Sequence, residues 1–309
     1  MAGQLIECVP NVSDGRNPET IGALAQVLTG RPGVALLDRH SDPDHNRTVF
    51  TFAGEPAAVA AAAIELAGRA ADLIDLNRNS GLHPRIGALD VLPFIPWRGV
   101  SMDECAALAV STGEEIWRRF RVPVYLYEHA ARRPERRNLA DVRRGEFERL
   151  RAEAPTNPSR RPDIGGPELH PTAGAVAAGA RKVLVAYNIH LAAPDASAAR
   201  RIARRVRESA GGLPCVKAMG LWLPSRGLAQ ISTNLTDYTV TPPHAVFAAV
   251  LREAEREGVA ISGSELVGLA PRAAVDAPPG LDLMWENLRP DSILEDRLAA
   301  GGFGAEDIG

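Results

Sequence analysis

The feature that most constrains the fold of this chain is the order of its apolar segments, which repeats once along the 309 residues. In the first half, short apolar or alternating runs typical of strands are separated by two longer helical runs. Strands are predicted over 5–11, 34–38, 47–54 and 88–96, and helices over 18–29 and 55–75. The order β-α-β-β-α-β is that of ferredoxin-like folds, in which two helices cover one face of a four-stranded sheet.

The same order returns in the second half, without a matching sequence period. Strands are predicted over 181–191, 216–224, 227–240 and 258–268, and helices over 195–210 and 244–257. Before it, a helix at 101–119 and a strand at 122–127 extend the first sheet, and the Arg- and Pro-rich stretch 131–163 predicts a short helix followed by an extended linker. We therefore predict an α+β protein of two ferredoxin-like β-α-β-β-α-β subdomains side by side, 1–178 and 179–309, with a ligand groove between them.

Composition narrows the class of partner. Hydrophobic residues make up 45% and charged residues 24% of the chain, as in ordinary globular proteins, and the formal net charge is −3. Such a balance provides no basic field for nucleic acid or an anionic membrane, so a small-molecule partner is favoured. The three cysteines are far apart and form no CxxC motif, and the N-terminus has no basic signal-peptide region. We expect a cytoplasmic protein without membrane spans.

A polar cluster extends from Asp38 to Arg47, between the second and third predicted strands. It resembles an oxygen-rich metal loop, but a calcium loop beginning at Asp42 would have Arg47 where Gly is required and Ala53 where Glu is usual. Its two histidines have no recognised zinc spacing. One interpretation is an Asx-rich turn that bonds its own backbone. The gathering of arginine, histidine and carboxylate groups at a strand end favours a functional site.

Two glycine-containing loops are the other candidates. In Gly81-Leu-His83-Pro-Arg85-Ile-Gly87, the histidine precedes a strand and is flanked by residues that restrict or free the backbone, which suits a positioned acid–base group. The alternative is a loop histidine bonded to a carbonyl. The loop 165–174 is able to offer backbone N–H groups to an anion or a heterocycle, or to act only as a hinge. No GxGxxG, GxxxxGK[ST] or GxSxG motif is present, so dinucleotide, P-loop and α/β-hydrolase sites are disfavoured.

Several long segments carry a family resemblance. They include LIECVPNVSDGRN, DHNRTVFTF, DLIDLNRNSGLHPRIGALDVLPFIPWRGVSMDEC, GARKVLVAYNIHL and LAQISTNLTDYTVTPPHAVF. Together they resemble the glutamate formimidoyltransferase (formiminotransferase) family, in the same order from about residue 4 to about residue 275. The resemblance implies a folate-binding transferase that moves a formimino group between N-formimidoyl-L-glutamate and tetrahydrofolate, in histidine degradation and one-carbon metabolism. It also implies a homodimer, and the chain length predicts a transferase without a cyclodeaminase domain.

The resemblance also assigns residues. The family's catalytic histidine corresponds to His83. We expect Asp38 as a second catalytic residue, and either Asp38 or Asp44 to orient the His83 ring. Arg47 and Arg85 are expected to hold carboxylates of glutamate or folate. The family's folate-binding stretch corresponds to the segment Gly165, Gly166, Pro167, Glu168, Leu169, His170, Pro171, Thr172, Ala173 and Gly174. Beside these, we expect Asp44, Asn46 and Asn234 to be further substrate- or folate-binding positions.

The expected chemistry is amidine exchange, in which His83 removes a proton from the incoming nitrogen and returns one to the departing nitrogen. Tetrahydrofolate is then a substrate, and no metal is expected. The chain departs from the family at Ala173, where a tryptophan is common, and at His40, where animal members carry an acidic residue. A different one-carbon donor, a metal-dependent hydrolase and a non-catalytic folate-binding protein stay open as alternatives.

Overall fold

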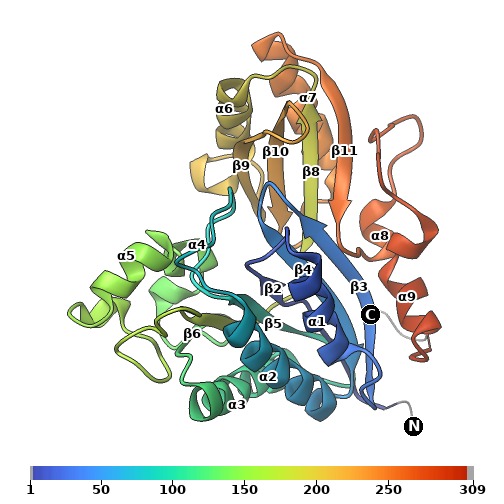
Figure 1. Cartoon of the computed structure of the whole chain (residues 1–309). Coiled ribbons are helices and arrows are strands. Elements are labelled where there is room, and N and C mark those ends of the chain that lie inside the picture. Colours follow the sequence, from blue (N-terminus) through green and yellow to red (C-terminus); the bar gives the residue numbers. More distant parts are fainter. Residues whose placement is uncertain (1–2, 305–309) are drawn as a thin grey trace. The chain divides into compact units, whose positions relative to one another are not determined.

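The computed structural model describes residues 3–304 (Figure 1). The chain divides into two compact units, one containing the described residues up to Arg181 together with 301–304, and the other containing 182–300. Each unit has its own β-sheet and its own buried core. The prediction of an α+β protein with two sheets is confirmed.

The sheet of unit 1 has the strand order β3-β4-β1/β2-β5-β7-β6, in which β1 and β2 are two parts of one interrupted strand and both pair with β4 and β5. Pro10 lies in the interruption, where a residue without a backbone N–H does least harm to the ladder. Pairing is antiparallel from β3 to β5 and parallel among β5, β7 and β6. The bounds are β1 Leu5–Cys8, β2 Asn11–Val12, β3 Val34–Asp42, β4 Arg47–Gly54, β5 Leu89–Arg98, β6 Val124–Glu128 and β7 Val176–Ala180.

Three helices of unit 1 pack side by side and bury their apolar residues against the sheet: α1 (Pro18–Leu28), α2 (Pro56–Leu73) and α3 (Met102–Phe120) (Figure 1). Side-chain caps explain where α1 and α3 begin. The Asn17 side chain accepts a hydrogen bond from Glu19 N at 3.0 Å, and Ser101 and Glu104 form a reciprocal capping box. All three predicted helices are confirmed to within two residues at each end.

Two expectations for unit 1 were wrong. Residues 131–163 do not form an extended linker but the folded elements η1 (Pro134–Arg136), α4 (Leu139–Val142), α5 (Glu146–Glu153) and η2 (Pro158–Arg160), whose apolar side chains Phe147 and Leu150 are buried. In addition, the Ala- and Gly-rich residues 176–180, not predicted as a strand, form β7 between β5 and β6. Small residues have weak strand preference, so only the pairing with both neighbours explains this strand.

Unit 2 has an antiparallel sheet of order β11-β8-β10-β9, and α6 and α7 bury their apolar residues in its core. The bounds are β8 Val185–Leu191, α6 Ala196–Val206, η3 Glu208–Ala210, β9 Val216–Leu223, β10 Leu228–Leu235, α7 Pro243–Glu257 and β11 Ile261–Val267. The short elements α8 (Arg272–Val275), η4 (Pro290–Ser292) and α9 (Leu294–Ala300) follow. Throughout residues 3–304, no helix is both long and apolar enough for a membrane crossing.

Candidate functional site

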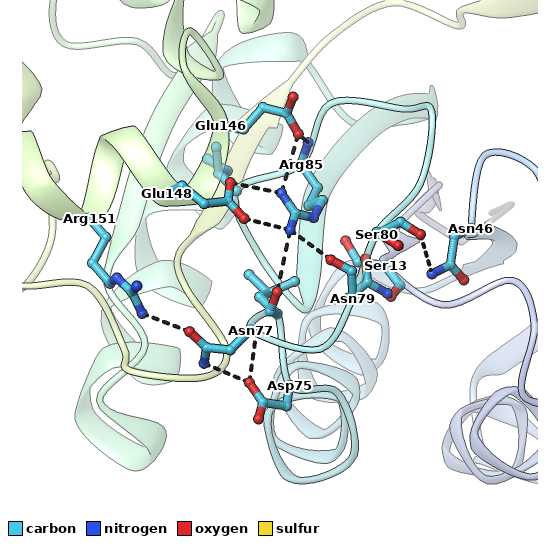
Figure 2. Close-up of polar contacts among 12 residues, drawn as sticks. Ser13, Asn46, Asp75, Asn77, Asn79, Ser80, Arg85, Glu146, Glu148 and Arg151 are labelled. Atoms are coloured by element: carbon cyan, nitrogen blue, oxygen red, sulfur yellow. Dashed lines mark hydrogen bonds and ion pairs between the residues drawn. The ribbon is translucent and has the colours of Figure 1, made fainter.

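The turn between β3 and β4 is held by its own polar side chains. Asp42 Oδ1 accepts a hydrogen bond from His45 N, three residues further on, at 2.8 Å, and Asn46 adopts a left-handed backbone with φ of 49°. Asn46 Oδ1 accepts from Gly15 N at 3.0 Å. Its Nδ2 donates to Ser80 O, also at 3.0 Å (Figure 2). The Asn46 amide therefore joins three loops through backbone contacts.

The loop that carries His83 lies directly against this turn. Leu82 N donates to Asp44 O at 3.1 Å, and a Cβ at Gly81 would lie 2.3 Å from His45 O, so only glycine permits the approach. The His83 and His45 ring centroids are 6.0 Å apart. His83 Nδ1 lies 2.8 Å from Pro84 O and must donate to it, which leaves the Nε2 lone pair of the neutral ring free to accept a proton.

Beside His83 is a charge cluster centred on Asp90, which is fully buried in β5. The Asp90 carboxylate accepts hydrogen bonds from Ile86 N at 2.7 Å, from Arg47 Nη1 at 2.8 Å and from Arg143 Nη2. Burial alone would raise the pKa of Asp90, but Arg143 and Arg47 outweigh it and hold that pKa below its usual range. The ionised carboxylate of Asp90 thus forms ion pairs with two largely buried guanidinium groups.

These two arginines act on His83. The pKa of His83 is held well below its usual value of 6.5. Burial is the largest cause, and the positive charges of Arg47 and Arg143 are the next largest. Arg47 is itself deeply buried, which lowers its pKa to about 10, but this is still far above neutral pH. At neutral pH, His83 is therefore an uncharged base beside two cations.

Arg85, two residues after His83, is engaged by the protein. Its Nη1 and Nη2 donate to Glu148 at 3.0 and 2.8 Å, and Nη2 also donates to Asn79 O at 2.9 Å (Figure 2). Weaker contacts reach Glu146 and Leu76 O, each at 3.3 Å. Arg85 therefore fastens α5 to the loop that precedes His83.

The segment 165–174 also packs against the residues around His83. His170 and Gly174 exchange both backbone hydrogen bonds at 3.0 Å, and His170 Nδ1 accepts from Ala173 N at 3.0 Å. Gly174 has φ of 68°, and a Cβ there would lie 2.1 Å from Ile86 O. Ala173 is buried in the core of unit 1, so a large ring at this position would need a different local packing. The N–H groups of 170, 173 and 174 are thus used within the protein.

Asp38 lies on the same strand face as Arg47 but further along the sheet. In the β3–β4 ladder Asp38 is opposite Thr51, and Asp42 is opposite Arg47. Four strand positions correspond to roughly 13 Å. His40, opposite Val49, belongs to the same face. The described contacts of the His83 ring instead involve Pro84 and His45.

Asn234 belongs to unit 2, where it lies half-buried in β10 between Ala186 of β8 and Lys217 of β9. One group among residues 3–304 could hold a metal ion, and it consists of His190 of β8, Glu265 of β11 and Glu286 from the segment that follows α8. Arg226 occupies this group, donating to Glu286 at 2.7 Å and to Glu265 at 3.2 Å. The two carboxylates are thereby partly neutralised by a side chain of the chain itself.

Asp90 and Arg143 were not predicted from the sequence. An aspartate within the apolar run ALDVLPFIP is a usable signal, because a carboxylate in a buried strand requires partners. Arg143 has no such signal, since it is one of many arginines in an Arg-rich stretch.

Comparison with known proteins decides the family. The model of the formiminotransferase domain, N-terminal subdomain, matches residues 5–181, and that of the formiminotransferase domain matches residues 186–278. The chain belongs to the formiminotransferase family. This confirms the family predicted from the sequence.

Individual members of the formiminotransferase family align over most of the chain. A glutamate formimidoyltransferase of Streptococcus pyogenes is 41% identical over 88% of this chain and 91% of its own length. One of Thermoplasma acidophilum is 39% identical over 95% of this chain and 97% of its own length. The formimidoyltransferase-cyclodeaminase of Rattus norvegicus is 45% identical over 89% of this chain, but the chain spans only 52% of that protein.

Proposed function

We propose that this formiminotransferase transfers the formimino group between N-formimidoyl-L-glutamate and tetrahydrofolate, a step of histidine degradation that feeds one-carbon metabolism. Its family, and two relatives named glutamate formimidoyltransferase that match over nearly their whole length, support the proposal. The observation that carries it is the state of His83. The ring is neutral, Nδ1 is bonded to Pro84 O, and Nε2 is left to move a proton.

In the proposed reaction, N5 of tetrahydrofolate attacks the formimino carbon and forms a carbon–nitrogen bond. His83 Nε2 accepts the N5 proton as the tetrahedral intermediate forms. The bond from that carbon to the glutamate nitrogen then breaks, and His83 returns the proton to this nitrogen. The products are 5-formimidoyltetrahydrofolate and glutamate, and His83 is regenerated neutral.

Structural contacts refine the other proposed roles. Asn46 and Arg85 position the loops around His83, because their polar atoms are bonded to the backbone or to α5. Arg47 is a substrate-facing cation held by Asp90. Asp38 contributes to catalysis from the same strand face, and Asp44 borders the His83 loop. Gly165–Gly174 and Asn234 remain proposed contacts of folate.

Two further parts of the proposal concern the whole protein. Strand orders β5-β1-β4-β3 in unit 1 and β11-β8-β10-β9 in unit 2, each antiparallel, support ferredoxin-like subdomains. We also propose a cytoplasmic homodimer that uses tetrahydrofolate as a substrate and needs no metal, as the family resemblance implies.

The decisive experiment measures 5-formimidoyltetrahydrofolate formed from N-formimidoyl-L-glutamate and tetrahydrofolate by the purified protein. His83→Ala is expected to lower kcat by about 100- to 10,000-fold, the usual contribution of general acid–base catalysis. His129→Ala is the matched control, because His129 is exposed and paired with Asp103.

Each rival has its own outcome in this assay. Folate binding without transfer in the wild-type protein would favour a non-catalytic folate-binding protein. Transfer only from a formyl amino acid would identify another donor. Release of the formimino group to water, dependent on added zinc, would favour the hydrolase.

A further inference from the structure

The cluster around Asp90 contains more positive than negative charge. Arg47 and Arg143 both donate to Asp90, and among residues 3–304 no other carboxylate forms an ion pair with either of them. The neighbouring carboxylates Glu146 and Glu148 are bonded to Arg85 instead. The side chains of Arg47 and Arg143 are only 8% and 11% exposed, so solvent compensates little of the surplus charge.

Two polar atoms around His83 also lack partners. Arg143 Nε and His45 Nε2 are buried and have no hydrogen-bond partner within the described part of the chain. Buried donors are almost always satisfied in proteins, so the Arg143 Nε–H at this site favours an acceptor from outside the described chain, whereas His45 Nε2 is a donor in one tautomer only. A surplus guanidinium charge and an unpaired guanidinium N–H favour a carboxylate, which arginine binds through paired hydrogen bonds.

We propose that Arg143, together with Arg47, binds the α-carboxylate of the formimino donor. This inference rests on the proposed function. The α-carboxylate is attached to the carbon that bears the reacting nitrogen, so it must lie within a few ångströms of the group that protonates that nitrogen. The carboxylates of folate, by contrast, are separated from N5 by the whole aminobenzoyl group. Of the two substrates, only the formimino donor can therefore place a carboxylate beside His83 during the reaction.

In this proposal, Arg47 and Arg143 select donors that have an α-carboxylate, and they also link donor binding to the pKa of His83. A donor without an α-carboxylate leaves two cations buried beside one carboxylate, which is costly. A bound α-carboxylate cancels part of the positive field on His83 and raises the His83 pKa toward neutrality. The histidine then holds the transferred proton better when a donor is present than when the site is empty of substrate.

Three donors test the proposal: N-formimidoyl-L-glutamate and its α-carboxamide and γ-carboxamide analogues. In the wild-type protein, kcat/KM is expected to fall roughly 10- to 100-fold for the α-carboxamide, as for loss of a charged hydrogen bond, and less for the γ-carboxamide. Arg143→Met is expected to lower kcat/KM for the acid by a similar factor and to lower it little further for the α-carboxamide.

The control variant is Arg144→Met, which changes an exposed arginine in the next position that pairs with Asp141. It should leave the preference among the donors unchanged. An Arg143→Met variant that slows all three donors equally would show a merely structural role and overturn the proposal. So would a wild-type protein that distinguishes the γ-carboxamide but not the α-carboxamide.

Calorimetry separates this inference from the proposed function. L-Glutamate is expected to bind the wild-type protein more tightly than its α-carboxamide, and Arg143→Met should abolish that difference. If no donor is turned over but this difference is found, the proposed function fails and the α-carboxylate site stands. If donors are turned over but wild type and Arg143→Met bind both ligands alike, the site is wrong and the function stands.

Discussion

Arg47 Nη1 lies 2.8 Å from Asp90 Oδ2, and the two side chains expose only 8% and 0% of their surface. The same carboxylate accepts from Arg143 and from Ile86 N, which lies at the end of the His83 loop. One buried residue therefore connects the start of β4, the end of α4 and the loop of the proposed catalytic base.

Replacement of Asp90 should destabilise unit 1 severely. Asp90→Ala leaves two buried guanidinium groups without their carboxylate, and we expect the free energy of unfolding to fall by about 3–5 kcal/mol. Urea denaturation followed by circular dichroism measures this. Glu115→Ala, which removes only a surface ion pair with Arg118, is the control and should not shift the midpoint. A loss below about 1 kcal/mol for Asp90→Ala would contradict a buried, paired carboxylate.

The pH dependence of transfer should reflect the lowered pKa of His83. The neutral ring is the base, so kcat/KM is expected to be level above pH 6.5 and to fall only on the acid side, as the pH passes through the lowered His83 pKa. Asp90→Asn removes a negative charge, lowers the His83 pKa further and moves the acid limb to lower pH. Arg143→Met removes a positive charge and moves it to higher pH. Profiles that coincide for all three proteins would exclude this electrostatic link.

The contacts of Arg85 predict a loss of order around His83. Arg85→Met removes the N–H groups that donate to Glu148, Asn79 O and Leu76 O. The free energy of unfolding should fall by about 2–3 kcal/mol. Hydrogen exchange is expected to quicken over residues 76–84, with a fall in kcat. Glu148→Gln leaves both carbonyl contacts in place and should have a smaller effect. Equal exchange in Arg85→Met and wild type would show that the clamp does not order the loop.

Removal of divalent metals should leave transfer unchanged. The proposed chemistry uses His83, and the carboxylates of Glu265 and Glu286 are already bonded to Arg226. The measurement is turnover after dialysis against EDTA, compared with mock-dialysed protein. Activity lost on dialysis and recovered with zinc would instead support a metal-dependent enzyme.

Part of the site could be predicted because it depends on local chemistry. A histidine between Gly81 and Pro84 at the start of a strand, and an Asx-rich turn ending at Asn46, carry their geometry in neighbouring residues. The Pro84 carbonyl on Nδ1 of His83, by contrast, was not predicted. That Asp38 or Asp44 orients the ring stays a prediction. The sequence does not show which group contacts the His83 ring, a carboxylate on β3 or the carbonyl of the next residue, because that depends on the register of β3 and β4.

By itself, the sequence determined the family, through long segments that resemble its members. It also determined the two successive β-α-β-β-α-β segments, since apolar periodicity and caps such as Asn17 act within a few residues. Only the tertiary structure decided that β7 inserts between β5 and β6, that Arg85 is bonded to Glu148, and that Arg143 shares Asp90 with Arg47. These outcomes join residues that are far apart along the chain. The energy of a buried charge depends on which partners surround it, and a linear pattern does not contain that information.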